Sequence, residues 1–295
     1  MNAPKQRWWE ELFTKNPMMA EVTRFRKRFL SFRGSSVAIN GGIGIVLVCY
    51  AIFAMICVYY RGDIDPLILI QGFLVLMLFG IPLLLHASIS GERERRSWDM
   101  LLVAPITHGQ IIVGKFMGAF AGLSMAFGLY MIPVLIDALF SADATIINIL
   151  LASITTLAQG ASLIAMTLLI SSRVKRPLIA LGVSIAIVMM YFIFVPLFVA
   201  SLSSFFGNFL TGIVSPIAVI QKLYLEQGRS ALEPDSSAFT ITSIDKFFLT
   251  FSHLAYQLVI TSALLMWSIK TLVFADNEVK FIPKSKTHAR SKKSA

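Results

Sequence analysis

The sequence predicts an all-α polytopic membrane protein with six transmembrane helices. Of the 295 residues, 56% are hydrophobic and only 14% are charged, and a soluble domain of this size cannot bury so much apolar surface. Six apolar runs, bounded by charges, Gly and Pro, each reach the roughly 20 residues that a helix needs to cross about 30 Å of hydrocarbon. They are Val37–Tyr60, Leu67–Ser90, Gly114–Phe140, Ile146–Ser172, Leu178–Phe206 and Phe248–Phe274. We therefore expect a six-span transmembrane domain over residues 37–274.

Residues 1–36 form a separate basic region before the first span. Asn16 is a good N-cap, and Pro17 suits the first position of a helix. The stretch MMAEVTRFRKRFLSFR then repeats apolar residues at spacings of three and four, with basic residues on the remaining surface. This pattern predicts an amphipathic helix in the headgroup region of a membrane. A helix packed on another soluble subunit would show the same pattern and stays an alternative.

Lysine and arginine indicate the orientation of the spans, because they resist transfer across a membrane. They concentrate before the first span and after the second, fourth and sixth spans, whereas the other loops hold only Arg61, Lys222, Arg229 and Lys246. We expect both termini in the cytosol, with a basic cytosolic tail over 275–295. The net charge of +10 follows from this bias and favours membrane lipid as a partner, so it gives no support to nucleic-acid binding.

An irregular apolar stretch precedes the last span. Over 207–225 the pattern is interrupted at Gly212 and at Ser215-Pro216, and the remaining pieces are too short to cross the membrane. We expect a re-entrant or interfacial element here, within a re-entrant and external region that covers 207–247.

The sequence contains no pattern that predicts an enzyme active site or a metal site. The histidines are scattered, and no cysteine or carboxylate pair lies at ligand spacing from them. The stretch GQIIVGKF, residues 109–116, has the glycine and lysine spacing of a P-loop, but Phe116 stands where that loop needs Ser or Thr to hold magnesium. We expect Lys115 to mark the cytosolic edge of the third span. We also expect this chain to have no catalytic residues and to bind no metal or cofactor.

The predicted cytosolic loop over 91–113 combines charged and large apolar side chains. Its first part places Glu92 one helical turn before Arg96, where the two can pair. A tryptophan and two leucines follow on a segment outside the membrane, and a proline ends that helix before Thr107 caps the next. Such apolar groups favour a protein partner, although burial against the amino-terminal helix is the alternative. The candidate contact residues are Arg93, Glu94, Trp98, Leu101, Leu102 and Pro105.

Two further sets of residues lie in or beside the spans. The four-residue spacing of the first set predicts a helix-packing face, made of Gly114, Gly118, Gly122 and Ala126. The second set is polar and supplies candidates for a substrate path or a titrating group, namely Gln71, His86 and Asp137. For His86 and Asp137, a satisfied residue at the membrane interface is the alternative.

From Glu92 the sequence reads ERERRSWDMLLVAPI, and Gly114-Lys115 follows at the start of the third span. This pattern resembles the permease subunits of type-2 ABC exporters. Their second span leads into a cytosolic coupling segment, Glu-x-Glu/Arg-x-Gly-Thr-Leu/Trp-Glu-x-Leu-Leu-x-x-Pro-Ile/Leu, and Gly-Lys opens their third span. Here Arg96-Ser97 replaces the frequent Gly-Thr, and Asp99 replaces the Glu. The amphipathic helix, the six spans and the broken element extend the resemblance over nearly the whole chain.

The resemblance implies a permease subunit of an ATP-driven exporter in the cytoplasmic (inner) membrane of a bacterium. Two copies of the chain, or this chain and a similar one, would form the translocation path as a dimer. A separate ABC ATPase subunit, in two copies per complex, would dock on the coupling segments and would bind the ATP and Mg. This chain would then not be an enzyme.

Two other functions stay open at the level of the sequence. An ion-coupled secondary transporter would use Asp137 or His86 as its titrating group and would contain internal repeats, and the first and last three spans reveal no convincing repeat. A non-transporting envelope anchor built on the same scaffold would hold or move a partner without carrying cargo.

Overall fold

The computed structural model describes residues 37–60, 65–94, 106–140, 146–201, 210–223 and 243–280. Within these ranges the chain is helical and contains no strand, which confirms the predicted all-α class. The expected amino-terminal amphipathic helix, the contact candidates Trp98, Leu101, Leu102 and Pro105, and residues 281–295 of the basic tail lie outside the described residues.

Five helical stretches are long and apolar enough to cross a membrane, and they correspond to the second to sixth expected spans. The first expected span coincides with helix α2, whose side chains are described from Val48 onwards. The helices are α2 (Val37–Tyr59), α3 (Pro66–Leu85), α4 (Ala87–Glu94), α6 (His108–Phe140), α7 (Ile146–Arg173), α8 (Pro177–Met189), the π-helical turn η2 (Met190–Phe194), α9 (Val195–Ser201) and α12 (Ser243–Lys280).

Local caps explain where α3 and α6 begin. Asp65 accepts a hydrogen bond from Leu67 N at 2.7 Å, and Pro66 occupies the first position of α3. Thr107 Oγ1 accepts from Gln110 N at 3.3 Å, while Gln110 Oε1 accepts from Thr107 N at 2.9 Å. This reciprocal capping box confirms Thr107 as the predicted cap, and it starts α6 ahead of the apolar run that begins at Gly114.

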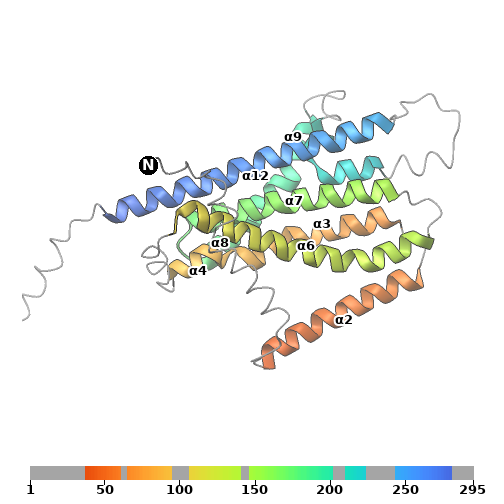
Figure 1. The fold of residues 1–295 in the computed structure, drawn as a ribbon, viewed down its shortest axis with the longest axis horizontal. Helices are drawn as coiled ribbons and strands as arrows, with labels where there is room; N and C mark the ends of the chain where they lie inside the picture. The colour runs from red at the N-terminus through yellow and green to blue at the C-terminus, as the bar shows by residue number, and fades with distance from the viewer. Residues whose placement is uncertain are drawn as a thin grey trace, which may run out of the picture.

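Helix α7 lies at the centre of the bundle. Figure 1 shows α3, α6, α7 and α12 side by side, with α2 on the outer side of α6. Helix α7 contacts α3, α4, α6, α8 and α12, and it is the most extensively buried of the five candidate spans. Leu74, Leu163 and Leu168 belong to the core, whereas Leu84 and Leu139 are 82% and 81% exposed. Such large apolar side chains on the outside suit a protein surrounded by lipid.

The second expected span is interrupted. The sequence predicts an uninterrupted run over Leu67–Ser90, but α3 ends at Leu85 and α4 begins at Ala87. Between them, His86 Nδ1 lies 2.9 Å from Leu83 O, the carbonyl that Ala87 N would bond in a continuous helix. A side chain that enters the helical hydrogen-bond ladder in this way is a known cause of a kink, and apolar periodicity alone does not reveal it.

The irregular region before the last span also departs from a regular helix. Its described part consists of short helices over 210–214 and 216–223, separated at Ser215. Ser215 Oγ accepts from Ala218 N at 3.4 Å, and Pro216 takes the first position of the second helix. The first helix contacts α12, because His253 Nδ1 lies 2.7 Å from Ile213 O. The predicted interruption at Ser215-Pro216 is therefore present in the backbone, whereas the one predicted at Gly212 is wrong, because Gly212 lies within the first of these helices.

Candidate functional site

Helix α4 is the base of the predicted docking segment, since residues 95–105 follow directly from its carboxyl end. Lys115 of α6 contacts this helix twice: Nζ donates to Ser88 O at 2.7 Å and forms an ion pair with Glu92 Oε1 at 2.6 Å. The side chains of Lys115 and Glu92 are only 12% and 28% exposed. The fold thus joins the first acid of the loop pattern to the lysine that opens the third span. Arg96, the partner that helical spacing predicts for Glu92, lies outside the described residues.

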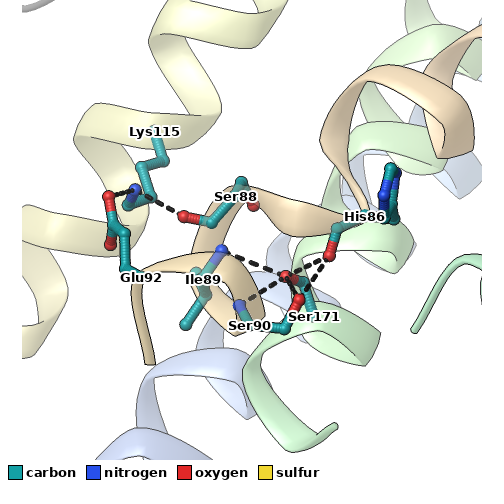
Figure 2. A network of polar contacts seen from close by, with 7 residues as sticks. All are labelled: His86, Ser88, Ile89, Ser90, Glu92, Lys115 and Ser171. Carbon is teal, nitrogen blue, oxygen red and sulfur yellow. Dashed lines mark hydrogen bonds and ion pairs between the residues drawn. The ribbon is translucent and has the colours of Figure 1, made fainter. Parts of the chain in front are cut away.

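Ser171 of α7 caps the start of α4 from a neighbouring helix (Figure 2). Its Oγ accepts from the backbone N of Ile89 at 3.1 Å and of Ser90 at 3.2 Å, and it donates to His86 O at 2.8 Å. A hydroxyl has one donor and two acceptor positions, so Ser171 uses its full capacity here. Ile89, Ser90 and Ser171 are fully buried. Two backbone N–H groups of the first turn of α4 and the His86 carbonyl therefore find partners in Ser171, as a buried helix end requires.

The two charged contact candidates on α4 differ in their surroundings. Glu94 is exposed at the end of α4. Arg93 is half-buried, and its Nη1 donates to Ser172 O at 2.7 Å. Ser172 Oγ in turn lies 3.2 Å from Thr271 Oγ1 of α12. Arg93 thus links α4 to α7, and the link continues to α12.

The stretch with P-loop spacing has another structure. Residues 109–116 lie inside α6, whereas a P-loop connects a strand to a helix. The predicted packing face begins in the same stretch: Gly114 is buried, Gly118 and Gly122 are half-buried, and Ala126 is exposed. Only the part of this face nearest α4 is therefore enclosed by the described chain.

Two of the three candidates for a substrate path or a titrating group, His86 and Asp137, lie far apart in the structure. His86 lies at the break beside α4, and Gln71 is half-buried on α3. Asp137 is fully buried near the other end of α6, about 33 Å from Lys115 along the helix axis at 1.5 Å per residue. Lys115 contacts Ser88, two residues from His86. The separation therefore excludes a single site that uses both His86 and Asp137.

A buried polar cluster that we did not predict from the sequence lies between α7 and α12. We term it the α7–α12 seam and define it by Gln159, Ser162, His253, Gln257 and Thr261. Gln257 Nε2 donates to Gln159 Oε1 at 2.6 Å, and Ser162 Oγ donates to Gln257 Oε1 at 2.5 Å. Ser162 Oγ also lies 2.9 Å from Thr261 Oγ1. Gln159, Ser162, His253 and Gln257 are almost fully buried. The seam lies near the middle of α7, about 20 Å from either end.

The π-helical turn η2 contributes a further contact to the α7–α12 seam. Tyr191 on this turn donates to Tyr256 Oη at 3.4 Å, and Tyr256 directly precedes Gln257 of the seam along α12. Both tyrosines are half-buried. A π-helical turn inserts an extra residue into a helix and is often found at functional sites. The turn thus connects the span over α8 and α9 to the seam.

A signal for the α7–α12 seam exists in the sequence. Helices α7 and α12 are the least hydrophobic of the five candidate spans. Along α12, polar residues recur at spacings of three and four, as Thr250, His253, Gln257 and Thr261. A polar stripe on a membrane helix indicates a face buried against protein, because lipid leaves its hydrogen bonds unsatisfied. The pairing with α7 requires the tertiary structure.

Comparison with known proteins agrees with this architecture. The family model described as ABC-2 family transporter protein matches residues 51–276, most of the chain. A comparison with curated proteins gave no match. The matched range includes α3, α4, α6 and α7, which together carry the Lys115, Glu92 and Ser171 contacts. With these membrane-spanning helices and this match, the chain is an integral membrane protein that belongs to the ABC-2 transporter family, whose members are the membrane permease subunits of ABC transporters and are not themselves catalytic.

Proposed function

We propose that this chain is the permease subunit of an ATP-driven exporter, coupled to a separate ATPase subunit through residues 93–105. The observation that carries the proposal is the construction of α4. Lys115, Ser171 and Ser172 hold this short helix from two neighbouring helices, so a force applied to the following segment acts on a fixed base. Family membership supports an ABC ATPase partner in general terms.

The complete arrangement that we propose has six spans, with α2 as the first. Both termini and α4 face the cytosol, and residues 207–247 form the re-entrant and external region. Two permease chains, identical or similar, form the translocation path, and two ATPase subunits bind the ATP and Mg. The distribution of lysine and arginine supports this orientation.

Substitution of Trp98 tests the docking segment. An aromatic anchor in a partner's pocket commonly contributes about 2 kcal/mol or more, so Trp98→Ala should greatly reduce co-purification of the ATPase subunit at matched amounts of folded permease. Leu102→Ala should weaken it as well. Phe198→Ala, which removes a large exposed side chain from α9, is the control and should leave binding unchanged.

The opposite result is also informative. Undiminished binding of the ATPase subunit by the Trp98→Ala and Leu102→Ala variants would remove this segment from the docking site. A fall in thermal stability of the isolated permease, with ATPase recovery reduced only in proportion, would instead place Trp98 against another part of its own chain.

A further inference from the structure

The break at His86 affects how a force on α4 can be transmitted to the rest of the protein. Helix α4 follows α3 in the chain, but the helical hydrogen bonds are interrupted between them. A joint without continuous helical hydrogen bonds can bend, so a force on α4 would bend the joint unless other contacts hold α4 in place. The contacts that do so come from α6 and α7.

The contacts from α7 are the more enclosed. Ser171 bonds Ile89, Ser90 and the His86 carbonyl, and all of these except His86 are fully buried. Hydrogen bonds in such surroundings are costly to break, because no water replaces the lost partner. The second contact, from Arg93 to Ser172 O, lies one helical turn further along α4. Two contacts at different points along a helix fix its direction as well as its position.

From α7 the connection continues into α12. Ser172 bonds Thr271, the Arg173 guanidinium lies 4.7 Å from the centre of the Trp267 ring, and the α7–α12 seam joins the two helices again at mid-membrane. The hydrogen-bonded residues differ in number by 95 to 99 along this contact, so the two helices run parallel. Helices α7 and α12 are therefore fastened at two levels of the membrane.

We propose that Ser171 is a positioning residue that fixes α4 to α7, so that α4, α7 and α12 move as one body when the docking segment is displaced, while the joint at His86 bends relative to α3. This inference rests on the proposed function and specifies the route by which motion enters the membrane. Motion would reach the middle of the bilayer through the fourth and sixth spans, and not only along the second span to which α4 is covalently joined.

The test measures two distances by double electron–electron resonance between spin labels. One pair joins Glu94→Cys on α4 to Lys270→Cys on α12, and the other joins Glu94→Cys to Leu84→Cys on α3. All three positions are exposed, and the native Cys49 and Cys57 are replaced by alanine. The complex with its co-purifying ATPase subunit is compared without nucleotide and after trapping with ATP and vanadate.

In the labelled protein with Ser171 intact, trapping should change the Glu94–Leu84 distance and leave the Glu94–Lys270 distance unchanged. Ser171→Ala should make the Glu94–Lys270 distribution about twofold wider even without nucleotide, because α4 then opens locally from α7. Ser171→Thr, which keeps the hydroxyl, should restore the narrow distribution. Thr167→Val is the matched control, since Thr167 is equally buried on α7 and its hydroxyl bonds Leu163 O of the same helix.

Two results would overturn the proposal. One is a Glu94–Lys270 distance that changes on trapping as much as the Glu94–Leu84 distance. This comparison is made in the labelled protein with Ser171 intact. The other is an unchanged distribution in a folded Ser171→Ala protein. If no ATPase subunit docks on the protein with its native Glu94, the proposed function fails, whereas the width measured without nucleotide still decides whether Ser171 holds α4.

Discussion

At the scale of the residue, Lys115 illustrates how one side chain can join two distant parts of the chain. It lies on α6, yet both of its hydrogen-bond acceptors, Ser88 O and Glu92 Oε1, belong to α4. Because the pair with Glu92 is largely buried, removing one partner leaves a poorly solvated charge behind. The lysine therefore stabilises the position of α4.

Lys115→Met keeps the length of the side chain and removes its charge. We expect it to lower the free energy of unfolding by about 2 kcal/mol, the usual contribution of a hydrogen bond to a charged group, as measured by denaturant titration in detergent micelles. Lys270→Met, at an exposed lysine of α12, should have little effect. In a double-mutant cycle with Glu92→Gln, the combined loss should be smaller than the sum of the two; simple additivity would show that the ion pair contributes nothing.

At the scale of the element, the pairing of α7 with α12 depends on polar side chains inside the membrane. Apolar side chains give little preference among helix partners in lipid, because lipid tails solvate them equally well. Hydrogen bonds such as those of Gln257 with Gln159 and Ser162 provide that preference. The α7–α12 seam therefore explains why α12 packs on α7.

Gln257→Leu removes the hydrogen bonds at the centre of the α7–α12 seam with little change in volume. Interhelical hydrogen bonds in membranes contribute about 0.6 kcal/mol each and up to about 1.7 kcal/mol, so we expect a loss of about 1 to 2 kcal/mol in unfolding by sodium dodecyl sulfate. Gln71→Leu, at a half-buried glutamine of α3, is the control and should cost less. Equal losses at Gln71 and Gln257 would argue against a special role for the seam.

At the scale of the whole molecule, we predict the direction of insertion from the charges of the loops. The segments rich in lysine and arginine alternate with segments that contain few, which predicts cytosolic termini and an external region over 207–247. The same orientation places α4 on the side where a soluble ATPase is found.

Cysteines introduced at Ser236 and Ser291 test this topology in a background without Cys49 and Cys57. In intact cells, Ser236→Cys should react with an impermeant thiol reagent, whereas Ser291→Cys should react only after the membrane is permeabilised. Labelling of Ser291→Cys from outside would reverse the orientation and would place α4 away from a cytosolic ATPase.

Several features of the protein could be predicted from the sequence alone. Composition and run length predict membrane helices, because the cost of apolar surface in water and the thickness of a bilayer are local constraints. The sequence correctly predicts Thr107 as a cap and Ser215-Pro216 as an interruption, since capping depends on residues within one turn. The loop pattern with Gly114-Lys115 resembled the family to which the chain belongs.

Other features required the tertiary structure. Glu92 and Lys115 are 23 residues apart, Ser171 lies more than 80 residues from Ile89, and Gln159 lies 98 residues from Gln257. Hydrogen-bond capacity is visible in a sequence, but the choice of partner depends on which helices pack together. The sequence therefore determined that this chain folds as helices in a membrane and which residues are unusual there. Only the packing of α4 against α6 and α7, and of α7 against α12, decided which of those residues meet, because polar groups in lipid must find their partners inside the protein.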